Sequence, residues 1–165
     1  MTTHAVEAAA VALHQRTWTP IPEELALASE FFARREQLEQ RLLPGMPACR
    51  NPQGWVTQHV LWLEDAARVA DELLALWRDY LPGSHMTVLL QAYADHARRV
   101  VPLAQQLSQA WATERPGACS HQETVWWEDW HLPAEQRRQL DELTHSTIVI
   151  GSVMVSALSQ AGYAP

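Results

Sequence analysis

The chain has 165 residues, of which 47% are hydrophobic and 19% charged, a composition that predicts one folded domain over residues 1–165. All twelve basic residues are arginines, so chemistry that needs a lysine, such as a Schiff base or a Walker-type phosphate loop, is excluded. The formal net charge is −7 and no basic run is longer than an arginine pair, so we expect no binding to nucleic acid.

Signals that the sequence lacks indicate where the protein is located and whether it needs a cofactor. The amino terminus has neither the basic nor the apolar region of a signal peptide, and no apolar run reaches the roughly 18 residues of a membrane-spanning helix. The two cysteines, Cys49 and Cys119, form no paired motif, which favours free thiols in a reducing compartment. We therefore expect a cytoplasmic protein with no membrane association and no cofactor.

The amino-terminal part of the chain predicts two helices. Apolar residues separated by alternating steps of three and four mark the buried face of a helix. This spacing predicts a short helix around Val6–Leu13 and a longer one over Ile21–Leu43. The inward positions of the longer helix are Ala28, Phe31, Leu38 and Leu42. Arg35 interrupts this apolar stripe.

The middle of the chain predicts a helical hairpin. One apolar stripe comprises Val56, Val60, Leu63, Ala67, Ala70, Leu74, Trp77 and Leu81, and a second beside it comprises Trp62, Ala66, Val69, Leu73, Leu76 and Tyr80. Two stripes indicate a helix that is covered on more than one side. Gly83 is placed to end this helix and Ser84 to cap the next. The next stripe comprises Met86, Leu90, Tyr93, Ala97, Val100, Ala104, Leu107 and Trp111, and Pro102 is expected to kink that helix.

The carboxy-terminal part predicts one more helix. Its stripe comprises Leu140, Leu143, Thr147, Ile150, Met154, Ala157 and Ala161, and Pro133 and Gly162 are placed to open and close it. The β-branched run Ile148-Val149-Ile150 could instead be a strand, but no partner strand is predicted. The fold class is therefore all-α: a four-helix antiparallel bundle with a short N-terminal helix and a long Trp-rich connection, Thr113 to Leu132, before the last helix.

This connection holds the most unusual composition in the chain. Three of the eight tryptophans, Trp126, Trp127 and Trp130, lie in it beside the acids Glu128 and Asp129. The helical stripes explain Trp62, Trp77 and Trp111 as core residues but leave these three unexplained. Two interpretations stay open: the segment folds back as a lid over the bundle, or it forms a surface that binds a partner.

The eight histidines raise the question of a metal site. A di-iron bundle needs Glu-x-x-His on two helices and a Glu from each of two others. The chain has this spacing at Glu128–His131 and Glu142–His145, but both lie in the same third of the sequence. A zinc site from Cys119, His121 and His131 is chemically possible but lacks paired spacing. The candidate metal ligands are therefore His121, His131 and His145, and no nucleophilic motif accompanies them.

Two segments resemble known families. Gln58 to Glu64, followed by Ala66-Ala67-Arg68, resembles the second helix of DinB-like metal-binding four-helix bundles, and His145 to Gly151 resembles their last helix. In that family three histidines bind the metal. Trp62 and Val149 take two of those places here and His145 keeps the third. The resemblance thus implies an all-α bundle with a degenerate metal site.

The second resemblance lies in the turn between the two middle helices. The tetrapeptide Pro82-Gly83-Ser84-His85, with Val88 and Leu90, is similar to the Pro-x-Asp-His turn of all-helical chaperones that mature redox enzymes. Ser84 stands where that family has Asp. This resemblance also implies an all-α scaffold.

These features favour a binding protein over an enzyme. We expect a non-enzymatic helical module that binds a protein partner or a second copy of itself. The expected binding surface is acidic and Trp-rich, and comprises Trp126, Trp127, Trp130, Glu128 and Asp129. The alternative is a small-molecule- or metal-binding four-helix bundle, including an enzyme of DinB-like type with a degenerate metal site.

Overall fold

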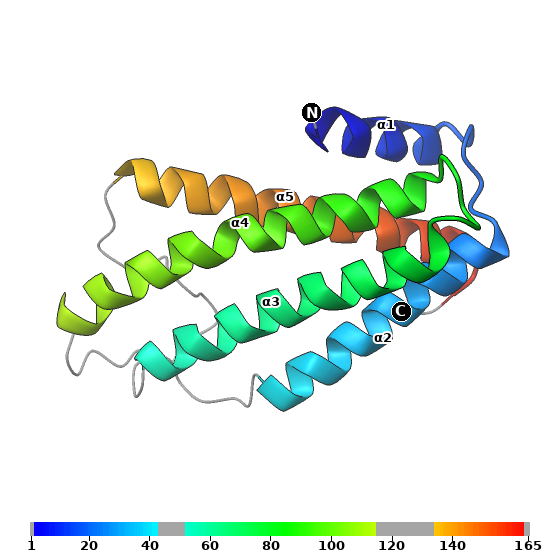
Figure 1. Cartoon of the computed structure of the whole chain (residues 1–165). Coiled ribbons are helices and arrows are strands. Elements are labelled where there is room, and N and C mark those ends of the chain that lie inside the picture. The colour runs from blue at the N-terminus through cyan, green and yellow to red at the C-terminus, as the bar shows by residue number, and fades with distance from the viewer. Residues whose placement is uncertain (1, 43–51, 115–133, 164–165) are drawn as a thin grey trace.

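The protein is a four-helix antiparallel bundle with an additional amino-terminal helix (Figure 1). The computed structural model describes residues 2–42, 52–114 and 134–163, and within these ranges all regular structure is helical. The helices are α1 (Thr2–His14), α2 (Pro22–Leu42), α3 (Pro52–Trp77), α4 (His85–Glu114) and α5 (Ala134–Gln160). The predicted fold class is confirmed. The run Ile148-Val149-Ile150 lies within α5, so the strand alternative is wrong.

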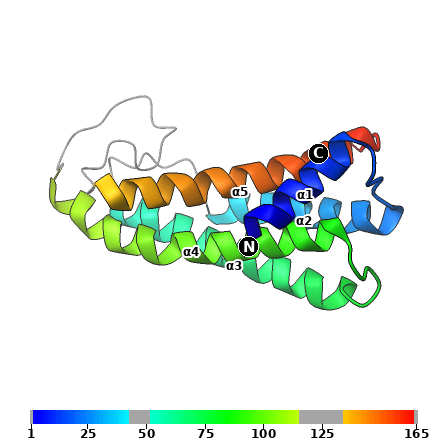
Figure 2. The same ribbon diagram turned by 90° about the horizontal axis from the view of Figure 1, so that it is seen from above.

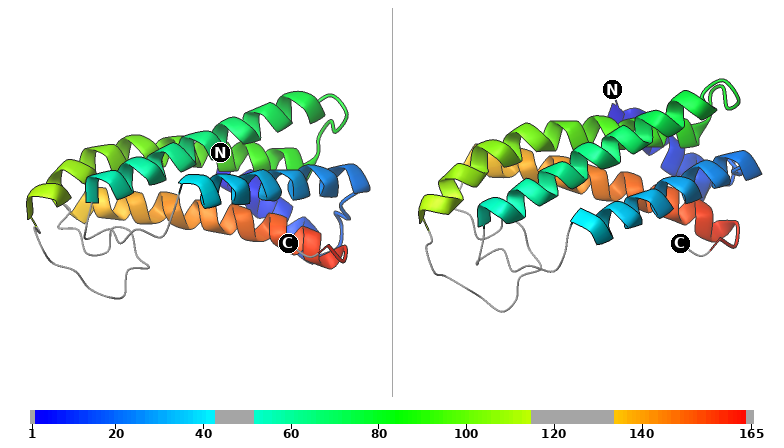
Figure 3. Two further views of the ribbon diagram at one scale, coloured as in Figure 1. Left: turned by 90° about the horizontal axis from the view of Figure 1, so that it is seen from below. Right: turned by 60° about the horizontal axis from the view of Figure 1, so that its bottom comes forward.

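Helix α4 occupies the centre of the packing. It contacts all four other helices, whereas α3 contacts α2 and α4 among the described residues. Helix α1 lies across α4 and α5 rather than joining the bundle, as the view from above shows (Figure 2). The opposite side is formed by α2, which contacts both α3 and α5 (Figure 3). Among the described residues, α1 therefore packs on α4 and α5 and not on α2 or α3.

The predicted stripes account for the core. In α4, the residues from Met86 to Ala104 that follow the predicted spacing are all buried, and the α3 stripe from Val60 to Leu74 is buried as well. In the second stripe of α3, Trp62 is half-buried and Ala66, Val69 and Leu73 are buried. Leu76 and Tyr80, at and beyond the end of α3, are exposed, with exposed fractions of 65% and 78%.

The predicted cap of α4 and the predicted end of α5 are confirmed, whereas α3 ends at Trp77, six residues before Gly83, and Pro133 lies outside the described residues. The Ser84 hydroxyl oxygen accepts hydrogen bonds from the backbone N–H groups of Met86 (3.1 Å) and Thr87 (3.4 Å), which is an N-cap of α4. Gly83 and Gly162 have φ angles of 68° and 82°, the left-handed conformation that glycine adopts at lowest cost. Pro102 lies inside α4, and the helix continues on both sides of it.

Charged side chains on the outer surface link neighbouring helices. Arg34 of α2 pairs with Glu72 of α3 at 2.7 Å, and Arg98 of α4 pairs with Asp71 of α3. Hydrogen bonds from Arg34 and then from Arg68 lower the pKa of the Glu72 carboxyl. Exposed pairs of this kind add little to stability because water and salt screen them, so the apolar core dominates. None of the described helices has an apolar stretch long enough to cross a membrane.

Candidate functional site

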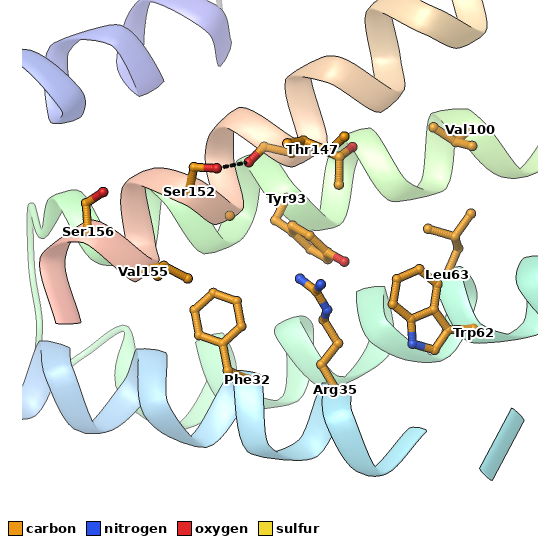
Figure 4. A pocket seen from close by; sticks show the side chains of 12 residues that line it. Phe32, Arg35, Trp62, Leu63, Tyr93, Val100, Thr147, Ser152, Val155 and Ser156 are labelled. Carbon is orange, nitrogen blue, oxygen red and sulfur yellow. Dashed lines mark hydrogen bonds between the residues drawn. The ribbon is translucent and has the colours of Figure 1, made fainter. Parts of the chain in front are cut away.

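A pocket of about 550 Å³ opens between α2, α3, α4 and α5 (Figure 4). This volume lies in the range of about 300–1,000 Å³ that is typical of small-molecule sites. We call it the Arg35 pocket. It is lined by Phe32, Arg35, Trp62, Leu63, Tyr93, Val100, Thr147, Ile148, Gly151, Ser152, Val155 and Ser156. Ile148, with an exposed fraction of 61%, marks the side that opens to solvent. Each of the four bundle helices contributes to the wall.

Arg35 extends from α2 into the middle of this pocket, among three aromatic rings. Its guanidinium carbon lies 5.6 Å from the ring centroid of Phe32, 5.5 Å from that of Trp62 and 5.7 Å from that of Tyr93. The interaction of a guanidinium with one aromatic face is worth about 0.5–2 kcal/mol, and more as the site becomes drier. The three rings therefore hold the Arg35 side chain in the pocket.

The positive charge of Arg35 has no carboxylate partner among the residues that the structure describes. The adjacent Arg34 does have one, in Glu72, because it lies on the outer side of α2. Glu39, one helical turn after Arg35, is exposed and forms no ion pair with it. A half-buried cation without a counter-ion is costly unless a partner or water compensates it. The described wall of the pocket thus supplies no carboxylate that pairs with this charge.

A second unsatisfied group lies in the same wall. The indole Nε1 atom of Trp62 is buried and has no hydrogen-bond partner among the described residues. An unsatisfied buried donor costs about 1–3 kcal/mol, so such groups are rare in native proteins. Trp62 was predicted to be a core residue; it is instead half-buried and lines the pocket. Arg35 and Trp62 both bring hydrogen-bond donors to the pocket wall, and the Trp62 donor has no acceptor among the described residues.

The α5 wall includes the small residues Gly151, Ser152 and Ser156. A Cβ atom at Gly151 would lie 4.0 Å from the Nη1 atom of Arg35, so the guanidinium spans from α2 to the backbone of α5. The hydroxyl groups of Thr147 and Ser152 donate to the carbonyl oxygens of Leu143 (2.9 Å) and Ile148 (2.8 Å). Their protons are therefore used within the helix. The donors available to a ligand come mainly from α2 and α3.

Tyr93 forms the base of the pocket on α4. Burial raises the pKa of its hydroxyl above the ordinary tyrosine value, while the nearby positive charge of Arg35 acts in the opposite direction. Because the folded pKa is raised, the contribution of Tyr93 to stability is fully present below about pH 10. It is lost as the pH rises from there through the folded pKa.

We therefore expect Tyr93 to ionise above about pH 10 in the folded protein. The measurement is a tyrosinate absorbance titration of the wild type minus that of Tyr93→Phe, which removes the signals of Tyr80 and Tyr163. Replacing Arg35 by Met should move the difference midpoint to a still higher pH, because the charge that lowers the pKa is gone. A wild-type midpoint at or below pH 10, or a fall in the Arg35→Met variant, would contradict this assignment.

Of the predicted metal ligands, His145 alone lies in the described part of the chain. His145 is exposed and lines a separate pocket of about 200 Å³ with Glu7, His96 and Val149. His96 is buried, and its Nδ1 atom is 2.7 Å from the carbonyl oxygen of Ala92. No group of three or more His, Cys, Asp or Glu side chains among the described residues is arranged to bind a metal.

The DinB-like arrangement is not reproduced either. Trp62 lines the Arg35 pocket, whereas Val149 and His145 line the smaller pocket on another side of α5. Three histidines at these positions would not face one site. Glu142, which precedes His145 in one of the two Glu-x-x-His segments, pairs through its carboxylate with Arg138.

The rest of the predicted site lies outside the described residues. This applies to the predicted interaction surface (Trp126, Trp127, Glu128, Asp129 and Trp130), to His121 and His131, and to Cys49 and Cys119. Comparison of the chain with family models, with curated proteins and with solved structures found no match. Function therefore has to be argued from the Arg35 pocket itself.

Sequence reasoning noted Arg35 but did not assign it a role. The signal was an arginine at an inward position of α2, between Phe31 and Leu38, where the stripe calls for an apolar residue. A charged residue at a buried helix position is uncommon unless it is paired or functional. Its ring partners lie 27 and 58 residues further along the chain, so the site itself required the structure.

Proposed function

We propose that the protein is a non-enzymatic binding module that takes up a small, largely apolar molecule in the Arg35 pocket. The observation that carries this proposal is a pocket of ligand size, walled by aromatic and aliphatic side chains from four helices, with the Arg35 guanidinium and the unsatisfied indole donor of Trp62 in its wall. Pockets that combine a mainly apolar wall with a few convergent polar groups are the usual form of small-molecule sites. The proposal follows the small-molecule alternative from the sequence.

The test uses the neutral fluorescent probe N-phenyl-1-naphthylamine. We expect its fluorescence to rise on binding with a stoichiometry of about one per chain. Gly151→Leu should weaken binding at least about tenfold, because the new side chain extends into the pocket and removes more than about 1.4 kcal/mol of apolar contact. Ser159→Leu is the matched control, since Ser159 is exposed on α5 and does not line the pocket.

Two results would overturn the proposal. One is a probe that does not bind the wild type, and the other is equal binding to the wild type and to Gly151→Leu. Circular dichroism of both variants checks the fold. Gly151→Leu should not lose helix content, because leucine favours a helix more than glycine does.

The predicted acidic Trp-rich surface is a separate hypothesis. Its test is the simultaneous replacement of Trp126, Trp127 and Trp130 by Ala. Loss of partner binding or of self-association with the fold intact supports an interface, whereas loss of stability supports packing against the bundle.

A further inference from the structure

We infer that the ligand of the Arg35 pocket is an amphipathic carboxylic acid whose carboxylate binds the Arg35 guanidinium. The inference rests on the proposed function and names the chemistry of its ligand. An arginine presents a planar fork of N–H donors that matches a carboxylate with two parallel hydrogen bonds. The described surroundings of Arg35 supply rings on several sides and no acidic partner.

The hydrogen-bond donors of the pocket determine which charge the polar group of the ligand carries. Arg35 is positively charged, and the buried Trp62 Nε1 can only donate. The Thr147 and Ser152 protons are already bound to backbone carbonyl oxygens. A ligand group that only accepts hydrogen bonds, as an ionised carboxylate does, satisfies Arg35 and Trp62. A cationic group would be repelled by the charge of Arg35. The described wall of the pocket offers it no carboxylate as a partner.

The shape of the pocket determines the rest of the ligand. Figure 4 shows Arg35 and Tyr93 in the middle, with Trp62, Leu63 and Val100 on one side and Phe32 and Val155 on the other. An apolar body of the ligand can therefore lie against the aromatic and aliphatic wall on either side of the guanidinium. A free inorganic anion would leave this wall without contacts, so the apolar body is part of the recognition.

The experiment compares an acid with its neutral isostere. 2-Naphthylacetic acid and 2-naphthylacetamide have the same ring system, and each is used to displace N-phenyl-1-naphthylamine at pH 7. We expect the acid to bind at least about tenfold more tightly than the amide, a difference of about 1.4 kcal/mol. Inorganic phosphate should not displace the probe.

Variants at neighbouring arginines assign the preference to one side chain. In Arg35→Met the acid and the amide should bind within about threefold of each other, whereas the neutral probe still binds. Arg35→Lys should keep part of the preference, because it retains the charge without the planar fork. Arg34→Met removes the same charge from the outer side of α2 and should leave the preference unchanged. It is the matched control for a general charge effect.

The outcomes separate the two proposals. Equal binding of the acid and the amide to the wild type overturns the carboxylate inference and leaves the proposed function standing. The same holds if Arg34→Met and Arg35→Met lose the preference for the acid over the amide to the same extent. Failure of the neutral probe to bind the wild type overturns the proposed function instead. If Arg35→Met does not fold, an unchanged preference in Arg35→Lys and displacement of the probe by phosphate both count against the inference.

Discussion

Replacing Glu24 by Ala is expected to lower the free energy of unfolding by about 3–5 kcal/mol and the melting temperature by about 10 °C. Glu24 is only 5% exposed, and its carboxylate accepts hydrogen bonds from three donors. These are the Trp18 indole Nε1 (3.2 Å), the Ile21 backbone N–H (3.1 Å) and the Ser84 hydroxyl. The substitution leaves these donors without their acceptor, at about 1–3 kcal/mol for each that remains buried.

The effect extends beyond one helix because Glu24 connects three parts of the fold. Its bond to the Ile21 N–H closes the first turn of α2, its bond to Ser84 fixes the residue that caps α4, and its bond to Trp18 fixes the segment after α1. The Trp18 ring in turn packs 5.1 Å from the His85 ring, measured between centroids. Glu24 therefore holds the α1–α2 segment against the α3–α4 turn.

The control is the neighbouring acid. Glu23→Ala changes the net charge equally in the same helical turn, but Glu23 is exposed and should cost less than about 0.5 kcal/mol. Thermal or denaturant unfolding measures both variants. Similar losses for the two substitutions, or a loss below 1 kcal/mol at Glu24, would show that the buried carboxylate is not the connection described.

Phe31→Ala is expected to cost about 3–5 kcal/mol of stability. Phe31 is fully buried in α2, and its ring centroid lies 5.0 Å from that of Tyr93 on α4 and 5.4 Å from that of Phe32. Removing the ring leaves a cavity between α2 and α4 and takes away the edge contact that fixes Tyr93. Denaturant unfolding at constant pH gives the free-energy change.

Phe32→Ala provides the comparison within the same helix. Phe32 is half-buried and lines the Arg35 pocket, so its removal should cost only about 1–2 kcal/mol. It should nevertheless weaken binding of N-phenyl-1-naphthylamine, because one face of the pocket and one ring around Arg35 are lost. Opposite results, with the larger loss of stability at Phe32, would mean that the two rings have been assigned to the wrong sides of α2.

The helices could be predicted from the sequence because their information is local. The spacing from Met86 to Ala104 identifies the buried face of α4 from a single segment, and Ser84 marks its beginning by the cap it favours. The same spacing assigned Leu76 and Tyr80 to the core, which is wrong, because a stripe does not reveal where the neighbouring helix ends.

The Arg35 pocket and the Glu24 connection could not be predicted, because their partners are remote. Ser84 lies 60 residues after Glu24, and nothing in the sequence tells which helix faces it. A glutamate in the first turn of a helix is ordinarily explained by its favourable interaction with the helix dipole. The position of Glu24 in the sequence therefore gives no sign that its side chain is buried. Trp62 follows a core stripe by its spacing, yet its indole nitrogen is unsatisfied at the pocket wall. The sequence pattern assigns faces to helices but does not locate gaps between them.

The wall of the Arg35 pocket comes from four helices, and this affects how a bound ligand can be detected. Its wall runs from Phe32 on α2 to Ser156 on α5, so a bound molecule ties together segments that span most of the described chain. At a concentration one hundred times its dissociation constant, such a molecule adds about 2.7 kcal/mol to the stability of the state that binds it. The backbone amides of α2, α3, α4 and α5 that exchange only through global opening would then slow together. Hydrogen exchange would thus report binding through the whole bundle, and the ligand could be recognised in a mixture before its identity is known.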